Sequence, residues 1–568
     1  MRDEAACRKL YDKWLKALNP DSAEARELTG IAGDPAQIKD RFYQDIEFGT
    51  AGLRGVCGAG TNRMNVYTVG RATRGIAQYV LKSGEDAERG IAIAYDCRHY
   101  SREFSELAAQ IFAAAGIPVY LFPSMRPTPE LSFVIRKLGC VAGVNMTASH
   151  NPKEYNGYKV YWKDGAQISG GVSEGMQKEI EALDFFGPYP RMALSEAEEK
   201  GLVRMLGEEQ DEAYMRYVLG LAQRPDDQLD LTVPVVYTPL NGAGSIPMRE
   251  MARRRKFTNF AVVPQQQDPD PDFKSVPYPN PENPQAFALA EELGRQRGAE
   301  LLIATDPDSD RMAAEIADGK GGYVPLSGNQ TGAILIDYMA RAQKEKGILT
   351  DGRRPAMIKS IVTGDFGAAI CRRYGIAVFE ALTGFKNICG RIPELEEKGY
   401  SYFFGYEESI GCAPGEEVRD KDGIAAGMLI AEWAAYCRHR GVTLRAALDE
   451  LFREYGYYLE KESSLVLTGA SGKQKISGIM QRFRLELPKT FGPCRVKEVV
   501  DFLHGHEDIP PQNALIFYME DGSWFAMRPS GTEPKLKFYV YTVDKDRQAA
   551  ESRLDGLYEG IRKEVEER

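Results

Sequence analysis

The chain has 568 residues, of which 43% are hydrophobic and 27% are charged. This is ordinary globular composition, which excludes a collagen-like, disordered or coiled-coil chain, and at roughly 150 residues per domain the length allows about four domains. The 72 lysines and arginines against 82 aspartates and glutamates give a net charge of −10, which argues against a nucleic-acid partner. An anion would therefore have to be bound by a local cluster of positive charge.

Cysteine usage and hydropathy predict a cytoplasmic protein with no membrane partner. The nine cysteines include no C-x-x-C pair, which does not indicate a disulfide framework or a zinc site. No apolar run approaches the 18 or so residues that a membrane-spanning helix needs. Residues 1–18 mix acids with bases and lack an apolar core, so they do not form a signal peptide. The spacing of Leu10, Trp14 and Leu18 predicts an amphipathic helix there instead.

A pattern of strand, polar turn, helix and strand occurs three times. The first unit has β-rich runs at 91–96 and 118–122, separated by a helical pattern over 101–116. Further units open at the runs 233–239 and 356–364, roughly 120 to 140 residues apart, which is domain spacing rather than solenoid spacing. Strands that alternate with helices predict crossover connections and mainly parallel sheets.

The C-terminal part of the chain has a different pattern. Residues 514–542 contain two β runs separated by Asp521-Gly522, a hairpin signal, and a third run that follows the polar loop 528–535. A charged helix over 546–568 closes the chain. We therefore expect an α/β fold with three similar mixed α/β sandwich domains plus a C-terminal α+β domain with an antiparallel sheet, around a central cleft. The expected boundaries are 1–40 for an N-terminal helical extension, 41–190 for domain 1, 205–318 for domain 2, 319–453 for domain 3 and 458–568 for domain 4.

A serine follows the apolar run that ends at Met146. Ser149 lies in the segment Thr147–Pro152, ahead of a proline that cannot donate an N–H group. Such an exposed hydroxyl with free backbone donors around it is a candidate nucleophile or phosphate carrier. A plain Asx or Ser turn is the alternative. His150 adjoins Ser149 in sequence, but adjacency alone does not establish a catalytic pair.

Three aspartates at alternate positions follow an apolar strand. Asp306, Asp308 and Asp310 cannot lie close together without a compensating cation, and a set of oxygen ligands suits a hard divalent ion such as Mg²⁺. An EF-hand is excluded because Arg311 stands where that loop needs glycine and Ala317 where it needs glutamate. A solvated acidic turn is the alternative. Three carboxylates leave the remaining coordination to water or to a phosphate oxygen.

A glycine-rich loop lies near the N-terminal end of the first domain. Residues 48–65 contain five early glycines, with Arg54 as the only early charge. The loop matches neither the dinucleotide-binding fingerprint nor the Walker loop, and neither motif occurs elsewhere in the chain. A glycine-rich turn without a ligand is the alternative.

Two further polar loops are candidates for binding a sugar and a phosphate. Glu407 and Ser409 follow a strand in a glycine-bounded loop and are good acceptors for sugar hydroxyls, although such residues also form helix N-caps. The loop over 526–537 is a good cradle for a phosphate dianion, or else a plain turn. Its donors are Arg528, Ser530, Thr532 and the amides about Gly531, with Lys535 and Lys537 nearby.

The loops complement one another chemically. A potential phosphate carrier, a metal loop, a polyol-binding loop and a phosphate cradle fall in four successive domains. A cleft shared by four domains would let each supply one of these functions, which is the arrangement that phosphoryl transfer on a sugar phosphate requires.

The ordered set of loops closely resembles the α-D-phosphohexomutase superfamily, which includes the phosphoglucomutase/phosphomannomutase family. The four signature loops are TASHNP (147–152), DPDSDR (306–311), GYEESIG (405–411) and RPSGTEP (528–534). The resemblance extends to GTAGLRG (49–55), YTPLNGAG (237–244), PNPENP (279–284), LSGNQTGAIL (326–335) and LTGFKNI (382–388), and so covers nearly the whole chain from about residue 40. Departures are small: Asn241 stands where many relatives have histidine, and Asn145 lies in the strand ahead of the serine loop.

The resemblance implies a reversible intramolecular phosphotransferase that needs Mg²⁺ and moves a phosphoryl group between C1 and C6 of a hexose phosphate. Ser149 would be carried as a phosphoserine, and one of its phosphate oxygens would complete the metal site of Asp306, Asp308 and Asp310. Arg311 and Arg54 would neutralise charge on the transferring group.

The resemblance also implies residues for substrate binding and proton transfer. Lys386 and His150 would be the general acid/base groups, with Lys159 as a weaker candidate that would also contact substrate. Glu407 and Ser409 would bind sugar hydroxyls. The residues that would bind the non-reacting phosphate are Arg528, Ser530, Gly531 and Thr532.

The expected substrate is glucose 1-phosphate, converted to glucose 6-phosphate with glucose 1,6-bisphosphate as activator. Mannose phosphates are the nearest alternative, and pentose phosphates or bisphosphate synthesis fit the same scaffold. A sugar-phosphate sensor without catalytic activity is a distant alternative, because such a protein would be expected to have lost Ser149 or an aspartate. Discrimination by the protein between epimeric sugars such as glucose and mannose depends on one or two hydrogen bonds of about 1 kcal/mol each.

Overall fold

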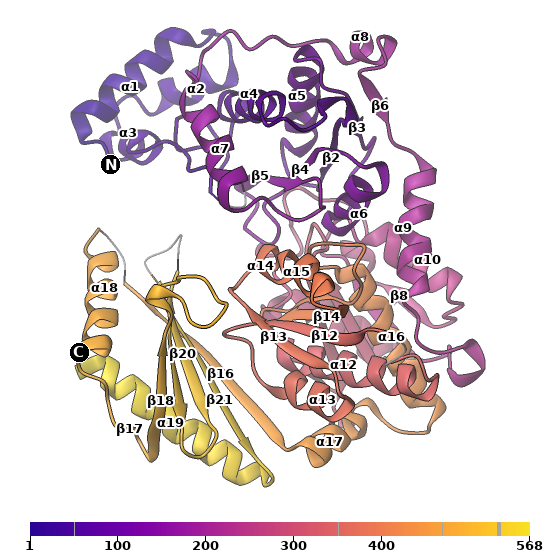
Figure 1. Cartoon of the computed structure of the whole chain (residues 1–568). Helices are drawn as coiled ribbons and strands as arrows, with labels where there is room; N and C mark the ends of the chain where they lie inside the picture. Colours follow the sequence, from indigo (N-terminus) through magenta and orange to yellow (C-terminus); the bar gives the residue numbers. More distant parts are fainter. Residues whose placement is uncertain (50–51, 350–351, 468–469, 531–534, 568) are drawn as a thin grey trace. The chain divides into compact units, whose positions relative to one another are not determined.

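The computed structural model (Figure 1) describes residues 1–49, 52–349, 352–467, 470–530 and 535–567. The chain divides into two compact units. The first unit comprises Met1–Leu326 with Ile410–His439, and the second comprises Ser327–Ser409 with Arg440–Arg568. No helix in the described ranges has the length and apolar character needed to cross a membrane.

Three helices begin the first unit: α1 (Glu4–Ala17), α2 (Ala23–Gly30) and α3 (Pro35–Phe42). Their caps, Asp3, Ser22 and Asp34, accept hydrogen bonds from backbone N–H groups of the first turn. Trp14 and Leu18 are buried, which confirms the predicted amphipathic helix at the N-terminus. The rings that pack against Trp14 belong to Phe42, Tyr67, Phe185 and Phe186.

The first sheet has the strand order β1-β5-β4-β2-β3-β6. Its parallel strands are β2 (Ile91–Tyr95), β3 (Val119–Leu121), β4 (Ala142–Met146) and β6 (Val203–Met205). Strand β5 (Tyr155–Trp162) runs antiparallel to β4, and β1 (Leu53–Val56) runs antiparallel to β5. The helices of this part are α4 (Val66–Lys82), α5 (Ser101–Ala114), α6 (Thr128–Leu138), α7 (Gly170–Glu181) and α8 (Leu194–Glu199). The predicted strand, helix and strand over 91–122 are confirmed.

The second sheet has the order β11-β10-β9-β7-β8. Strands β7 (Val235–Thr238), β8 (Phe260–Val262) and β9 (Leu301–Thr305) are parallel, whereas β10 (Met312–Ala317) and β11 (Tyr323–Pro325) form antiparallel pairs. Its helices are α9 (Glu208–Gly220), α10 (Ser245–Arg254) and α11 (Ala288–Arg297). The nearly wholly apolar helix α16 (Gly423–His439) packs on β9, β10, α9 and α10 and so lies in the first unit. The short strand β15 (Gly411–Ala413) precedes it.

The second unit begins with three parallel strands. Strand β12 (Arg354–Ser360) pairs with β13 (Ala377–Ala381) on one side and with β14 (Tyr400–Glu407) on the other. The surrounding helices are α12 (Gly328–Glu345), α13 (Phe366–Tyr374), α14 (Phe385–Gly390), α15 (Ile392–Glu397) and α17 (Leu444–Tyr455). The strand predicted at 356–364 and the helix and strand after it are confirmed.

The rest of the second unit is an antiparallel sheet with the order β16-β21-β20-β19-β18-β17. Its strands are β16 (Tyr457–Val466), β17 (Thr490–Phe491), β18 (Cys494–Asp501), β19 (Leu515–Met519), β20 (Trp524–Pro529) and β21 (Lys535–Asp544). Helices α18 (Ala470–Leu485) and α19 (Arg547–Glu567) share one apolar core with the sheet. The predicted hairpin at Asp521-Gly522 and the closing helix are confirmed, as is the overall class of three mixed α/β sheets plus an antiparallel C-terminal sheet. The domain boundaries and the central cleft stay predictions.

Glu315 makes the stability of the second sheet depend on pH. This β10 side chain is only 4% exposed, and its Oε2 is buried with no hydrogen-bond partner in the part of the chain that the structure describes. Burial, together with the charge of Glu291, raises the pKa of Glu315 to about 7. The folded chain therefore holds this proton more tightly than the unfolded chain, and the free energy of unfolding falls as pH rises from about 4.5 to about 7.

We expect Glu315→Gln to be more stable than the wild type at pH 8, by about 1 to 3 kcal/mol, and to lose this advantage near pH 4. Urea unfolding at a series of pH values measures the difference. Glu292→Gln on the exposed face of α11 is the control and should follow the wild-type pH profile. An equal pH dependence in Glu315→Gln and the wild type would contradict the assignment.

Candidate active site

Three aspartates gather in the loop that joins β9 to β10. The two strands pair antiparallel, with Thr305 opposite Met312, so the loop between them is tight. Asp306, Asp308 and Asp310 are all buried and each offers a carboxylate oxygen within 4.8 Å of the others. Within the described ranges this is the only group of three or more potential metal ligands. The structure therefore brings together the three side chains that the alternating pattern singled out.

The free oxygens of this cluster fit a divalent cation. Asp308 Oδ1 and Asp310 Oδ1 are buried and have no hydrogen-bond partner among the described residues. An anionic oxygen left in that state is costly. Carboxylate oxygens are the ligands that Mg²⁺ and Ca²⁺ prefer, so the two oxygens are suited to face a bound ion.

Two lysines partly neutralise the aspartates. Lys159, on β5, places its Nζ 2.6 Å from Asp308 Oδ2 and 3.0 Å from Asp310 Oδ2. Lys421 lies just before α16, with its Nζ 3.1 Å from Asp310 Oδ2. Burial opposes the charge of Lys159, but Asp308 and Asp310 outweigh it and raise its pKa. A lysine that holds its proton so firmly is unsuited to act as a proton acceptor, which argues against the acid/base role considered for Lys159. Lys421 was missed; its only signal was the charged run 419–422 directly before an apolar helix.

The carboxylates differ in their affinity for protons. Burial, followed by the charges of Asp308 and Asp310, raises the pKa of Asp306 well above its ordinary value. At Asp310, burial acts in the same direction, but Lys159 and Lys421 outweigh it and lower the pKa. The two lysines thus compensate the negative charge of Asp310, whereas Asp306 still faces the negative charges of its two neighbours. A cation bound here would relieve that repulsion.

Ser149 lies directly against this cluster. Its hydroxyl donates to Asp306 Oδ2 at 2.5 Å, and the residue is only 3% exposed. Its backbone has a φ of 51°, the left-handed region that costs a non-glycine residue energy. The Thr147 hydroxyl accepts the Ser149 amide at 2.8 Å and so helps to hold this turn. The serine at the end of β4 and the aspartates at the end of β9 therefore form one site within the first unit.

The other predicted residues of the first unit surround the serine. His150 Nδ1 lies 3.2 Å from Ser149 Oγ. Burial, followed by the positive charges of Arg311 and Arg54, lowers the pKa of His150 well below its ordinary value, so its imidazole is neutral at pH 7. Arg311 lies 3.8 Å from Asp310. Arg54 is exposed and donates to Asn151 Oδ1 at 3.2 Å, on the serine loop.

Arg98 holds the serine loop by its backbone, and sequence reasoning missed it. This buried guanidinium donates to the carbonyl of Ser149 at 2.6 Å and to that of Pro152 at 2.8 Å. It also bonds the carbonyls of Asn151 and Tyr155 and forms an ion pair with Asp96 at 3.2 Å. The only signal in the sequence was an arginine two residues after Asp96, the acid that directly follows β2.

The remaining predicted residues lie in the second unit. Glu407 Oε1 accepts the amide of Gly384 at 2.6 Å, and Arg528 donates to Thr383 Oγ1 at 2.9 Å, so both contact the loop before α14. Lys386 lies in the first turn of α14, and burial lowers its pKa. The structure thus brings Glu407, Arg528 and the loop of Lys386 together.

Hydrogen bonds also hold the chain next to Ser530 and Ser409. The Ser530 amide donates to the Lys535 carbonyl at 2.7 Å, which closes the base of its loop, whereas Gly531 and Thr532 lie outside the described residues. Ser409 follows Glu408, whose carboxylate accepts the Thr363 hydroxyl at 2.7 Å. Burial, followed by the charge of Glu407, raises the pKa of Glu408 to about 7.

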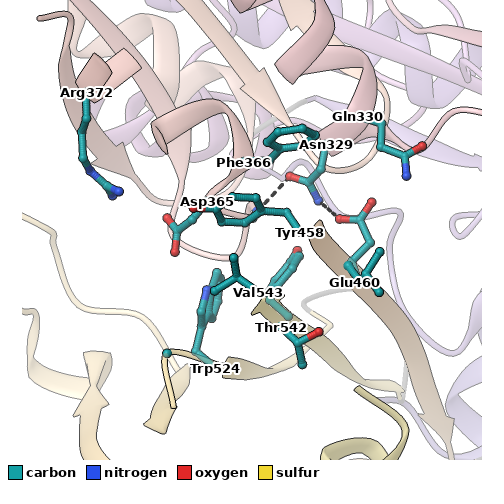
Figure 2. A pocket seen from close by; sticks show the side chains of 14 residues that line it. Asn329, Gln330, Asp365, Phe366, Arg372, Tyr458, Glu460, Trp524, Thr542 and Val543 are labelled. Atoms are coloured by element: carbon teal, nitrogen blue, oxygen red, sulfur yellow. Dashed lines mark hydrogen bonds between the residues drawn. The ribbon is translucent and has the colours of Figure 1, made fainter. Parts of the chain in front are cut away.

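The segment that begins at Ser327, part of the family resemblance, has a structural role in the second unit. Ser327 caps α12 and Gln330 closes a capping box with it. Asn329 accepts the Gly364 amide at 2.9 Å and donates to Glu460, as Figure 2 shows. A pocket of about 200 Å³ is lined by Asn329, Gln330 and Glu460 together with Tyr458, Trp524 and their neighbours. None of the predicted site residues lines this pocket.

Comparison with known protein families accounts for most of the chain. Residues 45–186, 212–320 and 327–455 match the alpha/beta/alpha domains I, II and III of phosphoglucomutase/phosphomannomutase. Residues 483–553 match the C-terminal domain of the same proteins. All four matches occur in the order that the family requires.

Individual relatives agree with these matches. A phosphoglucomutase of Staphylococcus haemolyticus is 36% identical over 522 residues, which cover 90% of this chain and 93% of the relative. A phosphoglucomutase of Staphylococcus epidermidis is 37% identical over 506 residues, which cover 87% of this chain and 90% of the relative.

Solved structures show the same fold at low identity. Parafusin, a phosphoglucomutase from Paramecium in its open form, gives a TM-score of 0.69 at 18% identity over 92% of this chain and 96% of its own. A phosphoglucomutase/phosphomannomutase family protein from Burkholderia thailandensis gives a TM-score of 0.66 at 18% identity. The match covers 90% of this chain and 96% of that protein. From the four domain matches and the identity over most of its length, the chain is an isomerase that belongs to the phosphoglucomutase/phosphomannomutase family.

Proposed function

We propose that the chain is a Mg²⁺-dependent phosphoglucomutase that carries its phosphoryl group on Ser149. The observation that carries the proposal is the position of the Ser149 hydroxyl, which lies 2.5 Å from one of three clustered, buried carboxylates. A hydroxyl in this position can present a phosphoryl oxygen to the same cation that the aspartates bind.

Asp306, Asp308 and Asp310 would hold the cation, with one phosphoserine oxygen as a further ligand. Once bound, Mg²⁺ would neutralise negative charge on the transferring phosphoryl group. Arg311 and Arg54 act in the same way from the surrounding loops.

The proposed reaction has two balanced halves. In the first, a sugar hydroxyl attacks the phosphorus on Ser149, the bond from phosphorus to the Ser149 oxygen breaks, and a hexose 1,6-bisphosphate forms. In the second, the Ser149 hydroxyl attacks the other phosphate of the bisphosphate and the sugar oxygen leaves. His150, neutral and 3.2 Å from Ser149 Oγ, exchanges the proton of the serine hydroxyl. Lys386 exchanges the proton at the sugar oxygen, since a pKa lowered by burial suits that role.

Substrate binding is assigned to the loops of the second unit. Glu407 and Ser409 bind sugar hydroxyls, while Arg528 and Ser530, with Gly531 and Thr532, bind the phosphate that does not react. The hydrogen bonds of Glu407 and Arg528 to one loop support a common site for these groups.

Glucose is the proposed sugar because the relatives that are 36% and 37% identical are named phosphoglucomutases. Mannose and pentose phosphates remain the alternatives. The cytoplasmic location inferred from the cysteines stays a prediction.

The test is an assay of the purified chain with Mg²⁺ and catalytic glucose 1,6-bisphosphate. Glucose, mannose, glucosamine, ribose and deoxyribose 1-phosphates are compared as substrates. We expect the highest kcat/KM with glucose 1-phosphate and loss of turnover in EDTA. If kcat/KM is more than about tenfold higher with mannose or ribose phosphate than with glucose 1-phosphate, the substrate would be reassigned. Tenfold corresponds to about 1.4 kcal/mol. Undiminished turnover in EDTA would refute the metal site.

A further inference from the structure

A chain of three buried side chains connects the strand that carries Ser149 with the aspartate loop. Asn145, on β4, donates from Nδ2 to Thr128 Oγ1 at 2.7 Å. Thr128, the first residue of α6, donates in turn to Asp308 Oδ2 at 2.7 Å. Thr128, Asn145 and Asp308 are all fully buried. Thr128 and Asn145 lie on the consecutive elements α6 and β4, whereas Asp308 is 180 residues from Thr128 in sequence.

The direction of these hydrogen bonds follows from the donors available. A carboxylate oxygen only accepts, so the single hydroxyl hydrogen of Thr128 must point to Asp308. The Thr128 oxygen must then accept from its other neighbour, which requires the amide nitrogen of Asn145 rather than its oxygen to face it. Asn145 therefore fixes the rotation of the Thr128 hydroxyl.

This arrangement occupies one carboxylate oxygen of Asp308 and leaves the other available for a ligand. Oδ2 accepts both the Thr128 hydroxyl and the Lys159 ammonium, the latter at 2.6 Å. Oδ1 is buried and has no partner among the described residues. Asp308 is thus held so that only Oδ1 is available to a cation.

We propose that Thr128, held by Asn145, is a positioning residue that orients Asp308 for metal binding through Oδ1. The inference rests on the proposed metal site and adds two residues to it. Groups that hydrogen-bond a metal ligand from outside typically change metal affinity by 10- to 100-fold when they are removed. The role belongs to the side chain alone, because the Thr128 amide separately donates to the Asp308 carbonyl at 2.8 Å and is kept in any substitution.

The test compares Mg²⁺ affinity in Thr128→Val, Thr128→Ser and Asn145→Ala, measured by calorimetry on the full chain without substrate. Valine keeps the shape of threonine but loses the hydroxyl, so we expect the Kd for Mg²⁺ to rise about tenfold or more. Serine restores the hydroxyl and should stay within about threefold of the wild type. Asn145→Ala frees the hydroxyl to rotate and should fall between the two. The rise in Tm on adding Mg²⁺ gives a second readout.

Two controls separate this role from general destabilisation and from failure of the metal site. Thr73→Val makes the same change at a buried threonine of α4, whose hydroxyl bonds the Val69 carbonyl and the Tyr158 hydroxyl but no aspartate, and should leave the Mg²⁺ affinity unchanged. Asp308→Asn should lose Mg²⁺ binding. The inference is overturned if Asp308→Asn loses binding while Thr128→Val and Asn145→Ala keep the wild-type Kd, an outcome that leaves the proposed function intact. A wild-type chain that binds no Mg²⁺ would overturn the metal site and this inference together.

Discussion

Ser149→Ala is expected to reduce mutase turnover by about 10⁴-fold or more, because the substitution removes the group to which the phosphoryl would be attached. The change should be small structurally: the Ser149 amide still has the Thr147 hydroxyl, and Arg98 still bonds the backbone carbonyl. Turnover is measured with glucose 1-phosphate, Mg²⁺ and glucose 1,6-bisphosphate. Mass spectrometry of the intact chain after incubation with the bisphosphate should find one phosphate on the wild type and none on Ser149→Ala.

Ser105→Ala is the matched control for this experiment. Ser105 is also fully buried in the first unit, but its hydroxyl donates to the Ser101 carbonyl within α5. We expect this variant to retain both turnover and the phosphate. Wild-type turnover in Ser149→Ala would eliminate Ser149 as the carrier, whatever the control shows.

The parts of this site that could be predicted from the sequence are those in which the chemistry is local. Asp306, Asp308 and Asp310 alternate within five residues after an apolar strand, so their convergence needs only a tight loop. Ser149 likewise follows its strand within three residues. The periodicity of 91–122 gave the strand, helix and strand because burial on both faces of a parallel sheet leaves a strong apolar signal.

The residues that were missed act across the fold. Thr128 and Lys421 contact the aspartate loop, yet they come from a helix start and from the segment before α16. Lys159 was expected at the substrate, and its pairing with the aspartates from an antiparallel strand was not foreseen. No local pattern marks such residues, because their role depends on which elements meet in space. Arg98 is similar: on the serine loop its partners are backbone carbonyls, which have no sequence signature.

The strained backbone conformation at the site could not be predicted from the sequence either. Ser149 and Ser309 have φ values of 51° and 56°, so the serine loop and the aspartate loop each contain a left-handed residue that is not glycine. Such a conformation costs of order 1 kcal/mol or more and persists when the surrounding contacts determine it. Here those contacts include Arg98 on one loop and, on the other, the Ser309 amide, which donates to the Asp306 carbonyl. Serine in itself does not predict this geometry.

Lys159→Met is expected to lower the free energy of unfolding by about 3 kcal/mol in EDTA, and Mg²⁺ is expected to restore most of that loss. Lys159 is 4% exposed and pairs with both Asp308 and Asp310, and removing one partner of a buried ion pair leaves uncompensated charge that typically costs 3 to 5 kcal/mol. A divalent cation on the same carboxylates supplies the missing positive charge. The rise in Tm on adding Mg²⁺ should therefore be larger in Lys159→Met than in the wild type.

Lys163→Met separates this effect from the loss of a lysine in general. Lys163 directly follows β5, four residues after Lys159; its side chain is 43% exposed and pairs with Glu85 at 2.5 Å. An exposed pair contributes about 0 to 1 kcal/mol, so this variant should change little in EDTA and should show the wild-type response to Mg²⁺. If Lys159→Met is as stable as Lys163→Met in EDTA, the aspartates do not depend on Lys159 for their charge balance. If it is less stable but gains nothing extra from Mg²⁺, the cation does not bind at the carboxylates that Lys159 contacts.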